Sequence, residues 1–273
     1  MGYPYKFFLV TIIITSVFIS CKKEEKVISK ATNNWIQIFN GKDLTGWTVK
    51  INEHPVNLNI HNTFRVEDSL LKVSYDGYDD FGTSYGHIFY KDPFSNYKLK
   101  FQYRFVGDQA SGGRPWAKKN SGVMLHAQSP ESMCLNQGFP VSLEAQLLGG
   151  VEEGVKRQTG NLGTPGTHVL INNELITEHC INSSSETFYG EEWIAMEVRV
   201  FNDSLISHII NGKEVIRYTK PTWGGEYTPD NDLWKSKDSK PLKAGYIAFQ
   251  SESHPIEFRN IKLLNLDDQP NKE

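Results

Sequence analysis

The sequence has no excess of charge of either sign. Its 273 residues include 29 Lys and Arg against 32 Asp and Glu, which gives a net charge of −3. The basic residues are scattered along the chain, so the sequence lacks the basic patch that a nucleic-acid-binding surface requires. With 38% hydrophobic and 12% aromatic residues, the composition is typical of a globular protein with a sizeable buried core.

The sequence also lacks a hydrophobic run long enough to span a membrane. Residues 7–19 form a run of 13 mostly apolar residues, whereas a membrane-spanning helix needs about 20. Because Lys6 precedes this run and a small residue and Cys21 follow it, residues 1–20 are predicted to be a signal peptide. The residues before Cys21 resemble the lipobox of bacterial lipoproteins, which implies that Cys21 is acylated. The alternative is a plain secretory signal with a coincidental cysteine.

Residues 21–33 are polar and show no periodicity, which predicts a flexible tether between the lipid and the folded domain. The Lys-Lys-Glu-Glu run at residues 22–25 is either a solvated part of this tether or a signal. It resembles the signals that send some Gram-negative lipoproteins to the outer face of the outer membrane. We therefore expect a cell-envelope protein, lipid-anchored to the outer membrane and either periplasmic or surface-exposed. Residues 267–273 are expected to be a polar tail.

Cysteine is scarce. The sequence has three, and once Cys21 is acylated only Cys134 and Cys180 remain. An oxidising envelope compartment would permit a disulfide bond between these two. The sequence does not show whether they lie close together, so the pairing stays open.

Helical periodicity is missing from residues 35–266, where short β-rich runs alternate with Gly, Pro, Asn and Asp. The clearest strand is residues 97–105, in which apolar and polar residues alternate over nine positions and therefore face opposite sides of a sheet. Asn211-Gly212 predicts a tight hairpin turn. Further strands are predicted at 63–66, 70–74, 86–90, 122–127, 141–148, 193–201, 205–210, 214–218, 245–251 and 256–264. This number of strands in one domain, residues 34–266, predicts an all-β fold of two stacked antiparallel sheets.

Two long segments, Gly149–Asn182 and Pro221–Leu242, interrupt the strand pattern and are predicted to be irregular loops. Such loops in a compact domain are usually functional or mobile. The second contains Trp223, Tyr227 and Trp234. These aromatic side chains either stack on sugar rings or only pin the loop to the sheets.

Motifs of several large enzyme classes are absent. The eight histidines form neither an H-x-H nor an H-E-x-x-H pattern, and no acidic run fits an EF-hand loop. Nucleophile-elbow, phosphate-loop and dinucleotide motifs are also missing. We therefore predict no metal site and no required cofactor. A structural or catalytic divalent cation such as calcium is the open alternative, because loop carboxylates and carbonyls far apart in sequence can share an ion.

The segment Trp35–Trp47, WIQIFNGKDLTGW, resembles the opening signature of the 3-keto-disaccharide hydrolase family. The stretches Asn120–Val123, Glu144–Leu147 and Gly245–Gln250, followed by Phe258–Ile261, occur in the same order as in that family. The resemblance covers essentially the whole domain. It implies a concanavalin A-like β-sandwich, or jelly roll, with two curved antiparallel sheets and a ligand cleft on the concave face.

Some relatives of this family are described as family-16 glycoside hydrolases, which place three acidic residues at i, i+2 and i+4 of one strand. The comparable positions here are Ser142, Glu144 and Gln146, which alternation places on one face. Only one of the three is a carboxylate, so a two-carboxylate retaining mechanism on this strand is not expected. A polar stripe of this kind still indicates a wet, functional face.

The resemblance implies another reaction, the cleavage of 3-keto-glycosides. A ketone at C3 acidifies the C2 proton, so one base can remove it, the glycosidic oxygen leaves by elimination, and water then adds. Glu144 is our candidate for the base or acid. His126 is its expected partner, because alternation in residues 122–127 places it opposite the core residues Val123 and Leu125.

The remaining candidates are substrate-binding residues, with a carbohydrate as the expected partner and the membrane contacted only through the lipid anchor. They are Gln146, Gln250, Asn120, Arg114, Trp116, Lys118, Arg157, Asn161, His168, Glu252 and His254. Two other functions fit the same fold. One is a non-catalytic, lectin-like carbohydrate-binding domain, and the other is a glycosidase that uses carboxylates from loops.

Overall fold

The computed structural model describes residues 1–4 and 34–268. The chain divides into two compact units, residues 1–32 and residues 33–273, and the account below concerns the second. The predicted tether and the predicted acylation site Cys21 lie outside the described residues, as do most of the predicted signal peptide and of the predicted polar tail. In the part of the chain that is described, no helix has the length and apolar character needed to cross a bilayer.

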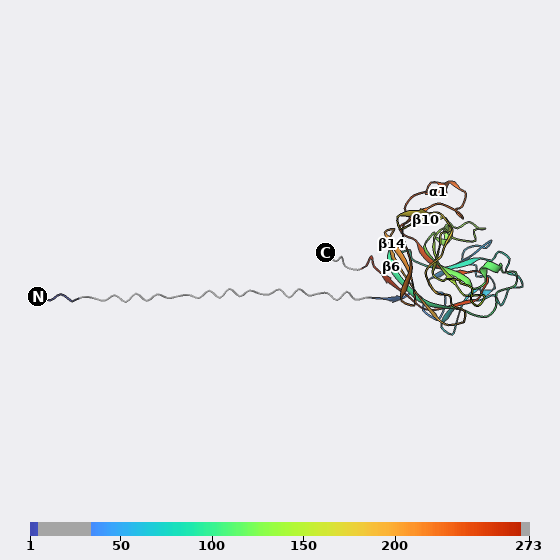
Figure 1. Cartoon of the computed structure of the whole chain (residues 1–273), viewed down its shortest axis with the longest axis horizontal. Helices are drawn as coiled ribbons and strands as arrows, with labels where there is room; N and C mark the ends of the chain where they lie inside the picture. Colours follow the sequence, from blue (N-terminus) through green and yellow to red (C-terminus); the bar gives the residue numbers. More distant parts are fainter. Residues whose placement is uncertain (5–33, 269–273) are drawn as a thin grey trace. The chain divides into compact units, whose positions relative to one another are not determined.

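The second unit consists of two antiparallel β-sheets (Figure 1). The larger sheet has ten strands in the order β11-β10-β15-β14-β13-β6-β17-β4-β3, with β1 also paired to β17. Its strands are β1 (Ile36–Gln37), β3 (Phe64–Glu67), β4 (Leu70–Val73), β6 (Asn96–Phe105), β10 (Thr167–Ile171), β11 (Glu174–Ile176), β13 (Ile194–Phe201), β14 (Leu205–Ile210), β15 (Lys213–Trp223) and β17 (Ile256–Asn265).

The smaller sheet has seven strands in the order β12-β9-β8-β7-β16-β5-β2. They are β2 (Trp47–Ile51), β5 (Gly86–Tyr90), β7 (Asn120–Ala127), β8 (Leu143–Leu148), β9 (Asn161–Gly163), β12 (Cys180–Ile181) and β16 (Tyr246–Ser251). The short helices among the described residues are η1 (Ile60–Asn62), η2 (Pro115–Ala117), η3 (Pro130–Ser132) and α1 (Asp232–Lys235). The prediction of an all-β sandwich is confirmed.

The predicted strand with the clearest alternation is β6, whose residues are alternately buried and more exposed. Its apolar positions face the second sheet because only one side of the strand contacts the core. The predicted hairpin is also present, since Asn211 and Gly212 join β14 to β15 with φ angles of 48° and 82°. These positive φ values are the reason for the Asn-Gly pair at this turn.

The prediction that Gly149–Asn182 is one irregular loop is wrong. This segment contains β9, β10, β11 and β12, which are divided between the two sheets. These strands have two to five residues, too few for alternation to be visible in the sequence. The segment Pro221–Leu242 likewise contains the end of β15 and α1.

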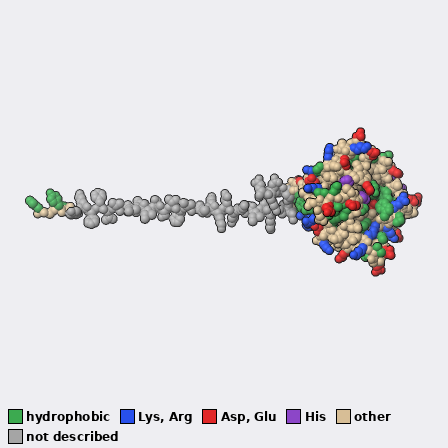
Figure 2. All heavy atoms as spheres, turned by 45° about the horizontal axis from the view of Figure 1, so that its top comes forward, with side chains coloured by type: hydrophobic (Ala, Val, Ile, Leu, Met, Phe, Trp, Pro, Cys, Tyr) green, Lys and Arg blue, Asp and Glu red, His purple; other side chains and the backbone are tan. Residues whose placement is uncertain are grey.

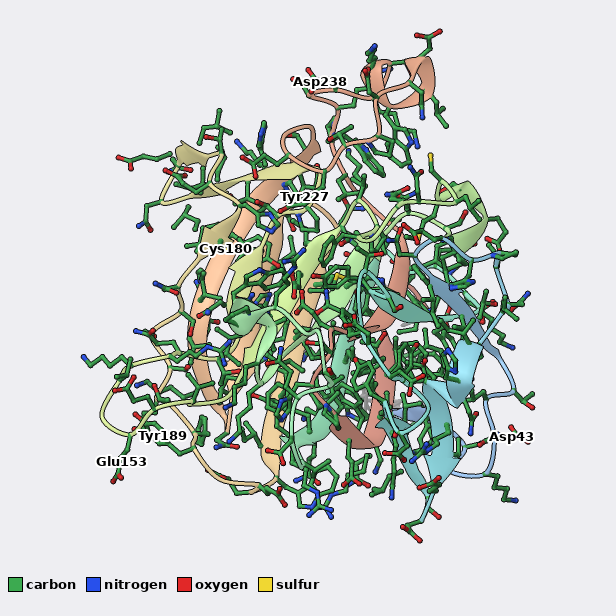
Figure 3. The ribbon with its side chains drawn as sticks, turned by 90° about the vertical axis from the view of Figure 1, so that its right-hand side faces the viewer. Asp43, Glu153, Cys180, Tyr189, Tyr227 and Asp238 are labelled. Carbon is green, nitrogen blue, oxygen red and sulfur yellow. The ribbon has the colours of Figure 1, made fainter. Side chains whose placement is uncertain are left out.

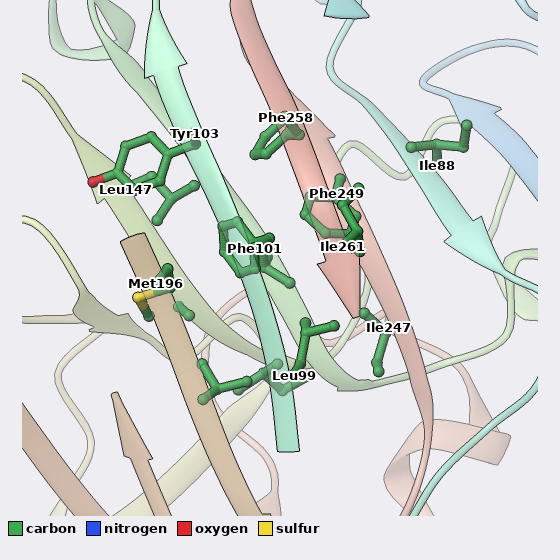
Figure 4. Packing of buried hydrophobic residues seen from close by; sticks show 14 of the residues in the cluster. Ile88, Leu99, Phe101, Tyr103, Leu147, Met196, Ile247, Phe249, Phe258 and Ile261 are labelled. Atoms are coloured by element: carbon green, nitrogen blue, oxygen red, sulfur yellow. The ribbon is translucent and has the colours of Figure 1, made fainter. Parts of the chain in front are cut away.

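The core lies between the two sheets, and aromatic rings join them (Figure 4). Phe249 of the smaller sheet packs edge-to-face against Phe101 and Phe258 of the larger sheet, with ring centroids 5.3 and 4.8 Å apart. Edge-to-face pairs add to the free energy gained from burial of apolar surface. The outer surface differs from this core, since charged side chains of both signs are interspersed on the visible face of the domain (Figure 2).

Two leucine truncations should separate core from surface. Leu99 of β6 is fully buried, whereas Leu175 of β11 is 63% exposed. Leu99→Ala should lower the free energy of unfolding by about 2–5 kcal/mol, because it removes buried methyl groups and leaves a cavity. Leu175→Ala should change it by less than about 0.5 kcal/mol. Urea unfolding followed by tryptophan fluorescence measures both, and equal effects would contradict the position of the core.

Candidate functional site

The seven-stranded sheet has one apolar face and one polar face. Along β8, Leu143, Ala145 and Leu147 belong to the core. Glu144 and Gln146 therefore lie on the opposite face, because successive side chains of a strand point to opposite sides. The local sequence thus places a carboxyl and an amide side by side on the face that is turned away from the other sheet.

A pocket of about 910 Å³ opens on this polar face. Its volume falls within the range of small-molecule binding sites. Figure 3 shows two of its residues, Cys180 and Tyr227, close to each other beside the strands. The lining residues are Tyr85, Pro115, Trp116, Asn120, Phe139, Glu144, Gln146, Leu148, Val151, Arg157, His179, Cys180, Tyr227 and Glu252.

The carboxyl group of Glu144 lies between two glycines of the neighbouring strands. Gly163 is its register partner on β9, and a Cβ at this glycine would stand 2.5 Å from the Glu144 Oε2 atom. A Cβ at Gly122 of β7 would overlap the Oε1 atom. Both glycines are therefore needed for space, and they allow the carboxyl to lie along the sheet between β7 and β9.

Burial controls the protonation of two carboxyl groups in the pocket. It raises the pKa of Glu144 to about 8. Glu252, which directly follows β16, is 3% exposed, and its pKa is raised by burial first and by the charge of Glu144 second, while Arg157 acts in the opposite direction. The two carboxyls titrate as a pair. At neutral pH the pair therefore retains a proton.

Arg157 contributes the positive charge of this site and also joins its walls. The guanidinium Nη1 donates hydrogen bonds to the carbonyls of Lys119 and Gly149 at 2.9 and 2.6 Å, and Nη2 donates to the carbonyl of Trp116 at 3.1 Å. These carbonyls belong to the segments before β7 and after β8. Arg157 thus fixes two walls of the pocket and places a cation beside the acid pair.

Amide side chains line the pocket next to the acids. The Oδ1 atom of Asn120 is buried and has no hydrogen-bond partner within residues 34–268. Gln146 accepts a hydrogen bond of 3.3 Å from Asn161 Nδ2. Asn161 does not line the pocket. Its hydrogen bond instead orients the Gln146 side chain, which does. The Asn120 Oδ1 atom is therefore available to accept a hydrogen bond from a hydroxyl group of a ligand.

Aromatic rings form a continuous arc along the wall of the pocket. Trp116 stacks on Tyr85 with an interplanar angle of 10°, Tyr85 contacts Phe139, and Phe139 contacts Tyr227. The arc ends at His179, whose ring centroid lies 4.8 Å from that of Tyr227. Trp116 and Tyr227 are 54% and 51% exposed. Their faces are therefore free to stack on an apolar face of a ligand such as a sugar ring.

The prediction that His126 faces Glu144 is wrong. His126 has a φ of 50°, and the register between β7 and β16 shifts at this point, which interrupts the alternation. Its ring turns into the interior against Tyr97 of β6, and Nε2 donates to the carbonyl of Asn202 at 3.2 Å. Met124 is the residue opposite Glu144. Burial lowers the pKa of His126 to about 4, so this histidine is a neutral structural group.

Of the predicted substrate-binding residues, Asn120, Trp116, Gln146, Arg157 and Glu252 line the pocket. The others do not. Gln250 and His254 are almost completely buried, and the His254 ring packs on Phe105. His168 lies on β10 of the other sheet, against Gly224 and Gly225. Lys118 and Arg114 are exposed, and Arg114 lies close enough to Tyr85 to lower the pKa of its phenol, although burial of the phenol raises it more.

Three other expectations have definite outcomes. Trp223 and Trp234 contact each other with their rings tilted by 50°, and neither lines the pocket. Cys134 and Cys180 are both free thiols, so the disulfide that the sequence left open does not form. Within residues 34–268, no three His, Cys, Asp or Glu side chains are grouped so that they could hold a metal ion.

Several residues of the pocket were not identified from the sequence. Tyr85, Phe139 and His179 lie in loops, where no periodicity indicates the direction of a side chain. Glu252 was predicted as a substrate-binding residue but not as the partner of Glu144, because it lies in a turn after β16. Its position two residues beyond Gln250 was the available signal, because strand alternation continued past β16 would place both side chains on one face.

A comparison with protein families finds that the model of the 3-keto-alpha-glucoside-1,2-lyase-like domain matches residues 34–264. No curated protein matches the chain. Two crystal structures of presumed glycosyl hydrolases from Parabacteroides distasonis share the fold. The first has 21% sequence identity, a TM-score of 0.50, and coverage of 85% of this chain and 94% of that protein. The second has 20% identity, a TM-score of 0.51, and coverage of 86% and 100%.

The raised pKa of Glu144 predicts how stability changes with pH. The unfolded chain loses this proton near the ordinary pKa of 4.5, whereas the folded protein keeps it up to about 8. The free energy of unfolding should therefore fall as pH rises between these values. Glu144→Gln, which is neutral throughout, should make this decline shallower. Urea unfolding at pH 5 and pH 8 tests it, with the exposed Glu174→Gln as matched control. An unchanged slope in Glu144→Gln would contradict the assignment.

Proposed function

Since the chain belongs to the family of 3-keto-alpha-glucoside-1,2-lyase-like domains, we propose that its pocket binds glycosides that carry a ketone at sugar C3 and cleaves their glycosidic bond. The observation that carries this proposal is the pair of buried carboxyls, Glu144 and Glu252, which share one pocket with Arg157. The reaction consists of abstraction of the C2 proton, elimination of the aglycone and addition of water.

The two carboxyls take different parts because they have different surroundings. Only Glu252 has a cation, Arg157, among the groups that shift its pKa. Arg157 favours the charged form of Glu252, although burial and the charge of Glu144 raise the pKa of this carboxyl. Because Glu144 has no such cation beside it, we assign the ionised form to Glu252 and the protonated form to Glu144 in the reactive complex. Glu252 is then the general base, and Glu144 is the general acid.

In the elimination step, Glu252 takes the proton from C2. The electron pair of that C–H bond forms the C2–C3 double bond of an enolate, whose oxygen is the former ketone oxygen. The enolate then collapses, the C1–O bond breaks, and the departing oxygen takes the proton of Glu144. The products are the free aglycone and an enone with a C1–C2 double bond. No oxidant is needed, because the ketone is already present in the substrate.

In the hydration step the carboxyls exchange roles. Glu144, now ionised, removes a proton from water as its oxygen adds to C1, and Glu252 returns a proton to C2. The product is the 3-keto sugar, and both carboxyls regain their starting protonation. One pair of carboxyls therefore serves both steps, each acting once as acid and once as base, as microscopic reversibility requires.

Other side chains of the pocket support this chemistry. The positive charge of Arg157 and the free Oδ1 side of the Asn120 amide lie where the polar groups of the substrate bind. Charge that develops on the enolate is stabilised best by groups that are already fixed in place, and Arg157 is fixed by its three bonds to carbonyls. The exposed faces of Trp116 and Tyr227 provide a stacking surface for the sugar or its aglycone.

An ordinary retaining or inverting glycosidase is the second candidate, because a pair of carboxyls in one pocket is also its requirement. That enzyme would cleave the unoxidised glycoside and would not exchange the hydrogen at C2. A lectin-like domain, the third possibility for this fold, would bind either sugar without cleaving it. These differences define the test.

The full chain is incubated in D2O with a 3-keto-glucoside and, separately, with the matching unoxidised glucoside. We expect release of aglycone from the 3-keto-glucoside only, with one deuterium at C2 of the product by NMR. Glu144→Gln and Glu252→Gln should each lower kcat by roughly 10²–10⁴-fold, whereas the exposed Glu174→Gln should not. Cleavage of the unoxidised glucoside without deuterium at C2 would support the ordinary glycosidase, and binding without cleavage would support the lectin.

The pH dependence of cleavage follows from the same pair. The general acid must be protonated, and Glu144 loses its proton at a pKa of about 8. The value of kcat/KM should therefore fall above about pH 8. In Glu144→Gln the residual activity should lose this alkaline decline. Initial rates measured from pH 5 to pH 10 provide the profile, and an alkaline limb that persists in Glu144→Gln would assign it to another group.

We further propose that the enzyme acts in the cell envelope, anchored by acylation of Cys21. The support for this is the sequence pattern of residues 1–21. Cells that express the wild-type chain should incorporate radiolabelled palmitate into it, and Cys21→Ser should abolish the label. Cys134→Ser is the matched control and should keep it. Label on Cys21→Ser would show that Cys21 is not the acylated residue.

A further inference from the structure

A row of mostly polar residues crosses six of the seven strands of the smaller sheet, two residues along β8 from Glu144. Most neighbours in the row are paired directly across adjacent strands. Gln250 lies beside Gly122 because the preceding residue, Phe249, is paired with Val123. In order across the strands the row is Asn161, Gln146, Gly122, Gln250, His87 and Lys50. Only Gln146 of this row lines the pocket.

The two ends of this row are satisfied by hydrogen bonds, and its middle is not. Asn161 donates to Gln146, and Lys50 Nζ donates to the carbonyls of Ile51 and Leu135 at 2.9 and 3.0 Å. Gln250 and His87 are both 0% exposed. Both amide atoms of Gln250 and both ring nitrogens of His87 lack a partner among the residues that the structure describes.

Four unpartnered polar atoms in one place are costly. A buried polar group without a hydrogen bond costs about 1–3 kcal/mol, and native proteins contain few of them. Hydrophobic side chains of similar size at these two positions would avoid that cost. The retention of an amide and an imidazole therefore indicates a ligand that supplies the missing hydrogen bonds.

These atoms lie next to the pocket. Gln250 of β16 lies two residues before Glu252 in the sequence. It also borders Gly122, and the Glu144 carboxyl lies over this glycine. The His87 ring contacts Phe139, with centroids 6.2 Å apart, and Phe139 belongs to the aromatic arc. The ring of Phe139 thus lies between His87 and the open part of the pocket.

The chemistry of the two residues fits neutral hydroxyl groups. An amide has both a donor and an acceptor group, and a neutral imidazole has one donor and one acceptor nitrogen. Burial, with Lys50 adding to it, lowers the pKa of His87 to about 3, so the imidazole carries no charge. A sugar hydroxyl also both donates and accepts, so each of the four atoms can be satisfied.

We propose that His87 and Gln250 form an inner subsite, covered by the Phe139 ring in this structure, which binds hydroxyl groups of the glycosyl unit on the side remote from the scissile bond. The subsite rests on the proposed function, because the acids define where the scissile bond lies. It makes His87 and Gln250 specificity-determining residues of the reaction. Its entrance requires a movement of the Phe139 side chain.

The test uses Gln250→Leu in the full chain that also carries Glu144→Gln, so that binding is measured without turnover. The probes are methyl 3-keto-α-glucoside and methyl α-glucoside, titrated by calorimetry. We expect roughly tenfold weaker binding than in Glu144→Gln alone, from the lost hydrogen bonds, and a Tm that is equal or higher because an unpartnered amide is removed. Gln102→Leu, on the outer face of the other sheet, is the matched control and should bind normally.

Unchanged affinity in Gln250→Leu, or a lowered Tm, would overturn the subsite, since a lowered Tm means that the amide is satisfied within the protein. A second measurement does not depend on a variant. In protein labelled with 15N-histidine, saturating methyl 3-keto-α-glucoside should shift the ring signals of His87, and unshifted signals would also overturn it.

The two experiments distinguish an error in the proposed subsite from an error in the proposed reaction. If the 3-keto-glucoside is cleaved but Gln250→Leu binds normally, the reaction stands and the subsite is wrong. If no glycoside is cleaved but Gln250→Leu weakens sugar binding, the subsite stands as part of a binding protein and the reaction is wrong.

Discussion

The packing of the seven-stranded sheet on the ten-stranded sheet is the constraint on which the site depends. Phe249, Phe101 and Phe258 join the two sheets, and the apolar side chains of β7, β8 and β16 face that contact. Every second residue of these strands is thereby directed to the opposite face. The acids and amides of the pocket occupy that face, so the core determines where the polar groups point. Loops and aromatic rings cover these polar groups and give them surroundings of low dielectric constant.

The parts of this site that the sequence predicted are those that follow strand periodicity. Glu144 and Gln146 alternate with core residues of β8, and their direction was therefore available before the structure. His126 was misplaced because a positive φ and a register shift reverse the direction of one residue, and no property of His in the sequence indicates a bulge. Glu252 and the aromatic arc depend on turns and loops, whose directions are set by tertiary contacts and not by a repeat.

The same distinction holds for the fold. The long strands β6, β13 and β17 were predicted because each presents several alternations, and the Asn211-Gly212 turn because its chemistry is local. The short strands β9 to β12 were missed. They form because neighbouring strands offer hydrogen bonds, which is information that lies elsewhere in the chain.

The two glycines beside Glu144 have a consequence for evolution. Any side chain at position 122 or 163 would occupy the space of the carboxyl, so a change at one of these three positions constrains the other two. Related chains that keep an acid at the position of Glu144 should keep both glycines. A chain that has replaced either glycine must move the carboxyl away from the place that it occupies between β7 and β9 in this structure.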